Sequence, residues 1–162
     1  MAPVTPYSGA LAGLDPITAL GETTRQIEAL TSSWTAEHFE RSYAPGKWSA
    51  RQILIHLAQT EMALGTRVRM ALSTPGYIAQ PFDQDVWMRR EQSLSGRDAA
   101  NAFLVLARMN TALYAALPAA DRDLPFSHPE YGSLTVDWVI HQSAGHQIHH
   151  LKQLDRILDS EF

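Results

Sequence analysis

The sequence predicts an all-α protein that folds as a four-helix bundle. Three observations support this fold class: four long stretches repeat apolar residues at helical spacing, a helix-capping residue precedes each of them, and two of their connections are long. The chain has 162 residues, which fits one domain over residues 1–162 with a single substantial core. A bundle is the arrangement in which four such helices bury their apolar faces against one another.

The first helix is predicted after a loose leader. Residues 1–14 are rich in proline and glycine and are expected to have no regular structure. Asp15 then provides an N-cap, and Pro16 occupies the first helical position, where its missing N–H costs nothing. Apolar side chains recur at helical spacing beyond it, so we predict a helix over 16–32, followed by an irregular connection over 35–48.

A capping box begins the second helix. The Ser49 side chain can accept a hydrogen bond from the backbone amide of Gln52, and the Gln52 side chain can accept one from the backbone amide of Ser49. The helix is expected to run to about Leu72. Glu61 projects close to the centre of its apolar face, where an unpaired charge costs several kcal/mol. Glu61 therefore needs a cation, a metal-bound group or a hydrogen-bonding partner such as an arginine, and a structural ion pair inside the bundle is an equal alternative.

The third helix follows a long connection. Residues 75–94 are expected to form a loop with a short helix at about 84–91, and Ser95 then opens a helix that ends near Leu117 because Pro118 follows. Apolar residues at helical spacing predict its core face: Ala99, Phe103, Leu106, Met109, Leu113 and Leu117.

The fourth helix contains most of the histidines. Residues 118–134 are expected to be a loop, and Thr135 caps a helix over 136–159 that carries four of the seven histidines. His146 and His150 lie about 40° apart on the helical wheel and one turn from each other, so that two imidazoles can reach one metal ion. Satisfied or surface histidines are the competing interpretation.

The other histidines are placed by the same wheel and by the predicted elements. His149 and His141 point away from the apolar stripe, towards solvent or a partner chain. His56 on the second helix could add a third nitrogen ligand if the second and fourth helices are neighbours, which would leave positions open for water or substrate. His38 and His128 lie in predicted loops, where solvated side chains are expected.

Composition excludes several classes of function. A formal net charge of -4 gives no electrostatic reason to expect nucleic acid or an anionic membrane surface as a partner. The N-terminus lacks the features of a signal peptide and no apolar run is long enough to span a bilayer, so a cytoplasmic protein is expected. The chain has no cysteine, so any metal must be held by nitrogen and oxygen ligands.

Four sequence blocks follow one another along these predicted elements: Tyr43–Ser49, His56-Leu57 with Glu61, Phe82–Asp85 and Gly145–Leu151. In this order and spacing they resemble the DinB-like superfamily of bacterial proteins, over the chain from about residue 15 to its end. The resemblance implies an up-up-down-down four-helix bundle, often a homodimer, with a divalent metal ion held by three histidines. Carried over to this chain, the ligands are His56, His146 and His150, and the candidate ions are Zn, Ni, Fe and Mn.

The resemblance leaves the reaction open. Some relatives transfer a low-molecular-weight thiol to an electrophilic small-molecule substrate, and others are labelled metal-dependent hydrolases. A divalent ion lowers the pKa of a thiol and of water alike, and the absence of cysteine fits both external nucleophiles. We place thiol transfer slightly ahead, with Glu61 or Arg67 as orienting or charge-stabilising groups. The alternative to both reactions is a protein that is not an enzyme, a dimeric binding or stress-response module.

Trp138 bears on association. It lies opposite the apolar stripe of the last helix, so its ring is expected to need cover from outside the bundle core. The leader or the 75–94 loop could cover it within one chain, and a second subunit could cover it across a two-fold axis. The resemblance favours the homodimer.

Overall fold

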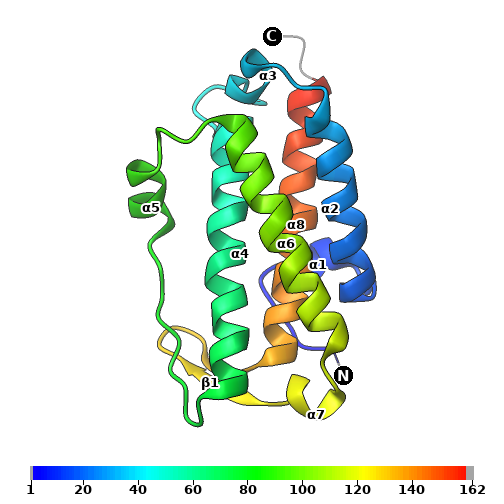
Figure 1. Ribbon diagram of the computed structural model, residues 1–162, viewed down its shortest axis with the longest axis vertical. Helices are drawn as coiled ribbons and strands as arrows, with labels where there is room; N and C mark the ends of the chain where they lie inside the picture. The colour runs from blue at the N-terminus through cyan, green and yellow to red at the C-terminus, as the bar shows by residue number, and fades with distance from the viewer. Residues whose placement is uncertain (1, 160–162) are drawn as a thin grey trace.

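Four long helices form the bundle in the computed structural model, which describes residues 2–159: α2 (Pro16–Ser32), α4 (Ala50–Ser73), α6 (Gly96–Ala116) and α8 (Val136–Asp159) (Figure 1). Their starts confirm the predicted caps. The Asp15 side chain accepts from the amide of Thr18, and both hydrogen bonds of the Ser49–Gln52 capping box are present. The amide of Trp138 donates to Thr135 Oγ1 at 3.1 Å. Local capping chemistry therefore sets where these helices begin.

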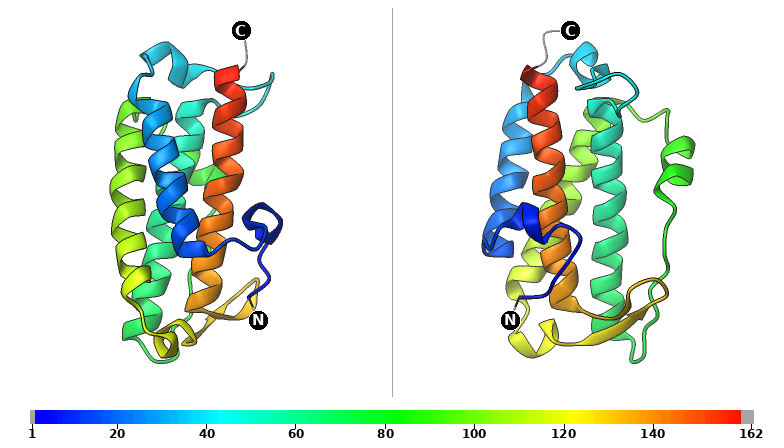
Figure 2. Two further views of the ribbon diagram at one scale, coloured as in Figure 1. Left: turned by 90° about the vertical axis from the view of Figure 1, so that its right-hand side faces the viewer. Right: turned by 180° about the vertical axis from the view of Figure 1, so that it is seen from behind.

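The helix directions follow from the connections. α2 and α8 run one way, and α4 and α6 run the other way (Figure 1). In chain order α2, α4, α6 and α8 run up, down, down and up. Counted from α8 and continuing with α2, α4 and α6, the same directions read up, up, down and down. α4 and α6 are parallel neighbours, so the chain must return along the bundle between them, and the long connection that carries α5 (Gln84–Arg90) does this beside α4 (Figure 2).

The core is divided by a polar layer. One apolar cluster surrounds Ile53, Phe103 and Leu154, and a second surrounds Val68 and Ile140. Between them the long helices bury polar side chains: His56, Gln59, Thr60, Glu61, Asn110, Ser143, His146, Gln147 and His150. Burying a polar group costs free energy unless it forms a hydrogen bond or binds a ligand. In this layer polar side chains therefore take the place of apolar core packing.

Short elements occur where the sequence analysis expected irregular connections. The 35–48 connection contains α3 (Ala36–Glu40). The 118–134 connection contains α7 (Ala119–Arg122) and an antiparallel hairpin of β1 (Pro125–His128) and β2 (Gly132–Thr135). The hairpin forms because its apolar cross-strand pair, Phe126 and Leu134, is buried in the second cluster. The short helix at 84–91 is confirmed as α5.

The N-terminal segment is ordered, which corrects the expected loose leader. It contains the helical turn α1 (Ser8–Leu11), buries Leu11 and lies along α8 (Figure 2). Gly145 of α8 permits this contact, because a Cβ at that position would lie 2.5 Å from the Tyr7 carbonyl oxygen and 2.7 Å from Tyr7 Cβ. No helix within residues 2–159 is long and apolar enough to cross a membrane.

Replacing Gly145 with alanine is expected to displace the N-terminal segment and to lower the free energy of unfolding by about 1–3 kcal/mol, the usual cost of overpacking. The matched control is Gly9→Ala in the same segment, because a Cβ at Gly9 meets nothing within 4 Å. Amide hydrogen exchange of residues 4–14 is the measurement. Unchanged protection in the Gly145 variant would show that the segment does not depend on this contact.

Candidate metal centre

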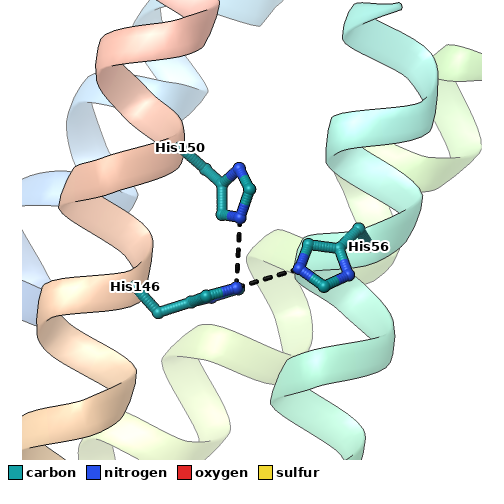
Figure 3. A group of neighbouring side chains, drawn as sticks. All are labelled: His56, His146 and His150. Atoms are coloured by element: carbon teal, nitrogen blue, oxygen red, sulfur yellow. Dashed lines mark hydrogen bonds between the residues drawn. The ribbon is translucent and has the colours of Figure 1, made fainter. Parts of the chain in front are cut away.

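Three histidine side chains converge between α4 and α8. His56 Nε2 lies 2.9 Å from His146 Nε2, and His146 Nε2 lies 3.1 Å from His150 Nε2 (Figure 3). His146 and His150 come from successive turns of α8, and His56 faces them from α4 (Figure 3). All three side chains are buried. The structure thus brings together the pair selected on the helical wheel and the histidine of the neighbouring helix.

The protonation of the cluster suits a cation. Burial lowers the pKa of His56 to about 4 and that of His150 to about 3, and it holds the pKa of His146 well below its ordinary value. All three rings are therefore neutral at neutral pH. His146 Nε2 has either one hydrogen or one lone pair, so it cannot form two independent linear hydrogen bonds with its two neighbours. Three ring nitrogens turned to one point fit an ion better than they fit one another.

The contacts around the rings fix their orientation. His150 Nδ1 lies 2.7 Å from Gln153 Oε1, an acceptor, so the ring hydrogen is on Nδ1 and the lone pair is on Nε2. Trp48 packs against His56 with 5.0 Å between ring centroids, and Tyr7 packs edge-on against His146 at 5.1 Å. His56 Nδ1 is buried without a partner among the described residues. Sequence reasoning did not assign Trp48 or Tyr7 to the site, because contacts made by loop residues have no periodic signal.

A cavity of about 270 Å³ adjoins the cluster. His56 and His146 line it, while His150 faces a separate hollow beside Trp48. The walls of the 270 Å³ cavity come from α4 and α8, the connection before α5, the β-hairpin and the N-terminal segment. This volume is near the small end of the range for small-molecule sites. The cluster is therefore accessible to a small molecule from one side.

Of the two predicted catalytic candidates, only Arg67 lines this cavity. Glu61 is fully buried behind it, where Asn110 Nδ2 donates to Oε2 and Gln147 Nε2 donates to Oε1, both at 2.8 Å. Burial raises the pKa of Glu61, and these two donors oppose the rise. The ion-pair hypothesis for Glu61 is wrong, because the partners of its carboxylate are the side-chain amides of Asn110 and Gln147. Arg69 donates to Asn110 Oδ1 and not to the carboxylate.

The other histidines lie apart from the cluster. His149 is exposed, as the wheel predicted, whereas His141 is largely covered and contacts Asp137. His38 completes a capping box at the start of α3. His128 corrects the expectation of a solvated loop residue, because the hairpin buries it in the cavity wall. Among residues 2–159, only His56, His146 and His150 form a group with metal-ligand spacing.

Trp138 is partly covered within the chain. Its indole Nε1 donates to the Val4 carbonyl oxygen at 3.0 Å, and its ring packs against Tyr131. The N-terminal segment thus provides the cover that the sequence analysis offered as the intrachain alternative. A homodimer stays a prediction that rests on the family resemblance.

Comparisons with known proteins agree with this architecture. A model of the DinB superfamily matches residues 19–154. A protein of Oceanobacillus iheyensis, provisionally named a metal-dependent hydrolase, is 28% identical over 119 residues, which cover 73% of this chain and 69% of that protein. YfiT of Bacillus subtilis, with the same kind of provisional name, is 22% identical over 145 residues, which cover 87% of this chain and 81% of YfiT.

The fold has a solved counterpart. The structure of YfiT from Bacillus subtilis, described as a four-helix bundle of unusual topology, matches with a TM-score of 0.79 at 20% sequence identity. The match covers 89% of this chain and 84% of that chain. At this identity the likeness shows the fold. The family model covers most of the chain and includes all three converging histidines, so this protein belongs to the DinB superfamily.

Proposed function

We propose that this protein is a divalent-metal enzyme in which His56, His146 and His150 hold the ion and the adjoining cavity receives a small-molecule substrate. One observation carries the proposal: three buried, neutral imidazoles turn their Nε2 atoms to one point beside a cavity. Three protein ligands leave coordination positions open, which is typical of catalytic metal sites, whereas structural sites are closed. Zn, Ni, Fe and Mn are the candidate ions.

The chain's own residues have two tasks at this site. Gln153, Trp48 and Tyr7 hold the imidazoles in place and exclude water from their outer sides. Thr60 Oγ1 and Gln142 Oε1 are buried polar atoms without partners among the described residues, and both residues line the cavity. A bound substrate would satisfy them, because buried polar atoms gain most from a partner that replaces lost water.

The nucleophile is expected to come from solution. When bound, a divalent ion supplies Lewis acidity, which deprotonates a coordinating thiol outright and brings the pKa of water towards about 7. Hydrolysis in histidine-ligated enzymes commonly adds a carboxylate base beside the ion. Among the described residues that line the cavity, the one carboxylate is Glu130, whose charge raises the pKa of Arg67 and of His128 against the larger lowering by burial. The charge of Asp85 acts in the same way on the pKa of His56, but Asp85 does not line the cavity. We therefore place transfer of a low-molecular-weight thiol to an electrophile first.

Hydrolysis is the second candidate, and the provisional names of the relatives favour it. It requires the same three ligands and the same cavity, and it differs only in the nucleophile. The two reactions are thus separated by kinetics and share one ligand set.

The metal-loaded protein is expected to accelerate the reaction in which a small thiol displaces chloride from 1-chloro-2,4-dinitrobenzene, giving the aryl thioether, a chloride ion and a proton. The rate should be at least tenfold that of the thiol alone, which corresponds to about 1.4 kcal/mol of barrier. A panel of thiols is assayed by absorbance, with p-nitrophenyl acetate in parallel as the hydrolytic substrate. His56→Ala is expected to lose the rate, and His38→Ala, a substitution outside the cluster, is expected to keep it. Metal-dependent ester cleavage without thiol transfer would select hydrolysis. Absence of both rates would favour the non-catalytic module.

A further inference from the structure

Arg67 is a buried cation that has no carboxylate within ion-pair distance in the described part of the chain. The residue is 8% exposed. Among the described residues its side chain makes one hydrogen bond, 3.0 Å from Nη2 to the Gln80 carbonyl oxygen, which uses one of five guanidinium donors. Within residues 2–159 Arg67 forms no ion pair. Burying an unpaired charge costs several kcal/mol, so an arginine in this position is expected to bind an anion.

The position of Arg67 relates this charge to the metal centre. His56, Thr60, Leu64 and Arg67 occupy one face of α4 and all line the same cavity. Arg67 follows His56 by eleven residues, roughly 16 Å along the helix at 1.5 Å per residue. Helical side chains point back towards the helix N-terminus, which along α4 is the direction from Arg67 to His56. An elongated small molecule in the cavity could therefore contact His56 at one end and Arg67 at the other.

His128 adds a second donor at the same end. The Glu130 amide donates to His128 Nδ1 at 3.2 Å, so the neutral ring has its hydrogen on Nε2. That Nε2 is buried without a partner among the described residues. Arg67 is close enough to His128 for its charge to lower the pKa of that imidazole, after the larger effect of burial. A guanidinium and an N–H donor thus share one end of the cavity.

We propose that Arg67, with His128 beside it, binds a carboxylate of an elongated substrate or co-substrate whose other end reaches the metal centre at His56 and His146, the two ligands that line the cavity. The planar guanidinium matches a carboxylate by two parallel hydrogen bonds, and the low dielectric of the cavity strengthens them. This inference rests on the proposed function, because it places the reacting end of the molecule at the metal centre. It adds the substrate class, an organic anion, and a specificity-determining residue.

Glu130 is the competing partner for Arg67, since its charge is one of those that act on the guanidinium. Glu130 is exposed at the hairpin turn and does not come within ion-pair distance of Arg67. An exposed carboxylate keeps its hydration and contributes little to such a pair. A substrate carboxylate enclosed in the cavity meets the guanidinium at a lower dielectric, where the attraction between the two charges is stronger.

The test uses bifunctional thiols on the Co²⁺-loaded protein, because binding of a thiolate to Co²⁺ gives a near-ultraviolet charge-transfer band that requires no turnover. The probes are 6-mercaptohexanoate and its neutral analogue 6-mercaptohexan-1-ol. The native protein is expected to bind the carboxylate about 10-fold to 100-fold more tightly, since a charge-assisted hydrogen bond contributes about 1.5–3 kcal/mol. Arg67→Met, which keeps an apolar stem, is expected to abolish the preference, and Arg67→Lys to restore part of it.

Arg89→Met is the matched control, because Arg89 is exposed on α5 and its loss changes the net charge equally. Its preference for the carboxylate should equal that of the native protein. Equal binding of the two probes by the native protein, or an unchanged preference in Arg67→Met, would overturn the proposal.

Failure of the metal centre is recognised separately. If no Co²⁺ is taken up, the proposed function fails, and the metal-free protein is then titrated with hexanoate and hexanamide while the Trp138 indole resonance is followed by NMR. Trp138 lines the same cavity. A shift with hexanoate that Arg67→Met removes supports the anion site on its own, and no shift overturns it.

Discussion

Replacing His56, His146 or His150 with alanine is expected to reduce bound divalent metal from about one ion per chain to background. Each variant leaves two nitrogen ligands in a site that offers no cysteine and, among residues 2–159, no nearby carboxylate in the ligand group. Elemental analysis after loading and extensive dialysis gives the measurement. A second readout is thermal unfolding: a ligand that binds only the folded state raises the unfolding temperature, so metal should stabilise the native protein and not the variants.

His149→Ala is the control for this experiment. His149 is on the same helix, one position from His150, and it is exposed outside the ligand group. Its loss removes an imidazole without removing one of the converging nitrogens, so metal content should stay at the native level. Full metal content in both the His56 and the His150 variants would disprove the site, whereas loss in all four variants would point to general destabilisation.

The long helices were predictable because their signals are local. The Ser49–Gln52 capping box and the Thr135 cap act within one turn, and apolar spacing within α4 and α8 is a property of each helix alone. The same wheel selected His146 and His150. Their partner His56 required knowledge that α4 and α8 are neighbours, which periodicity does not provide and the family resemblance implied.

The remaining features depend on contacts between distant segments. On α6 the sequence analysis placed Met109 in the core, yet Met109 is half exposed while Asn110 and Tyr114 are buried. The helix is rotated towards its polar residue because Asn110 bonds Glu61 of α4, a contact that hydrophobic spacing cannot reveal. The hairpin was missed for a related reason: its strands are stabilised by the core they cover and by hydrogen bonds to the connection before α5.

Asn110 is the residue on which the buried Glu61 carboxylate most depends. Its Nδ2 donates both to Glu61 Oε2 and to the Glu61 backbone carbonyl, and its Oδ1 accepts from Arg69. Asn110→Ala is therefore expected to lower the free energy of unfolding by about 1.5–3 kcal/mol, because its hydrogen bonds to Glu61 are lost while Gln147 still donates to the carboxylate. Asn101→Ala, an exposed position on the same helix, is expected to change it by less than about 0.5 kcal/mol. Chemical denaturation of the metal-free proteins measures both.

The charge of Glu61 gives this prediction a pH dependence. Burial raises the pKa of Glu61 above its ordinary value of 4.5, so the stability linked to its protonation is present below pH 4.5 and is lost as pH rises through the folded-state pKa. Asn110→Ala removes a donor that opposes this rise, so its cost should be larger at neutral pH than near pH 4.5. In a Glu61→Gln background there is no charge to compensate, and the cost should be smaller and independent of pH. Equal costs in both backgrounds would show that Asn110 acts through packing alone.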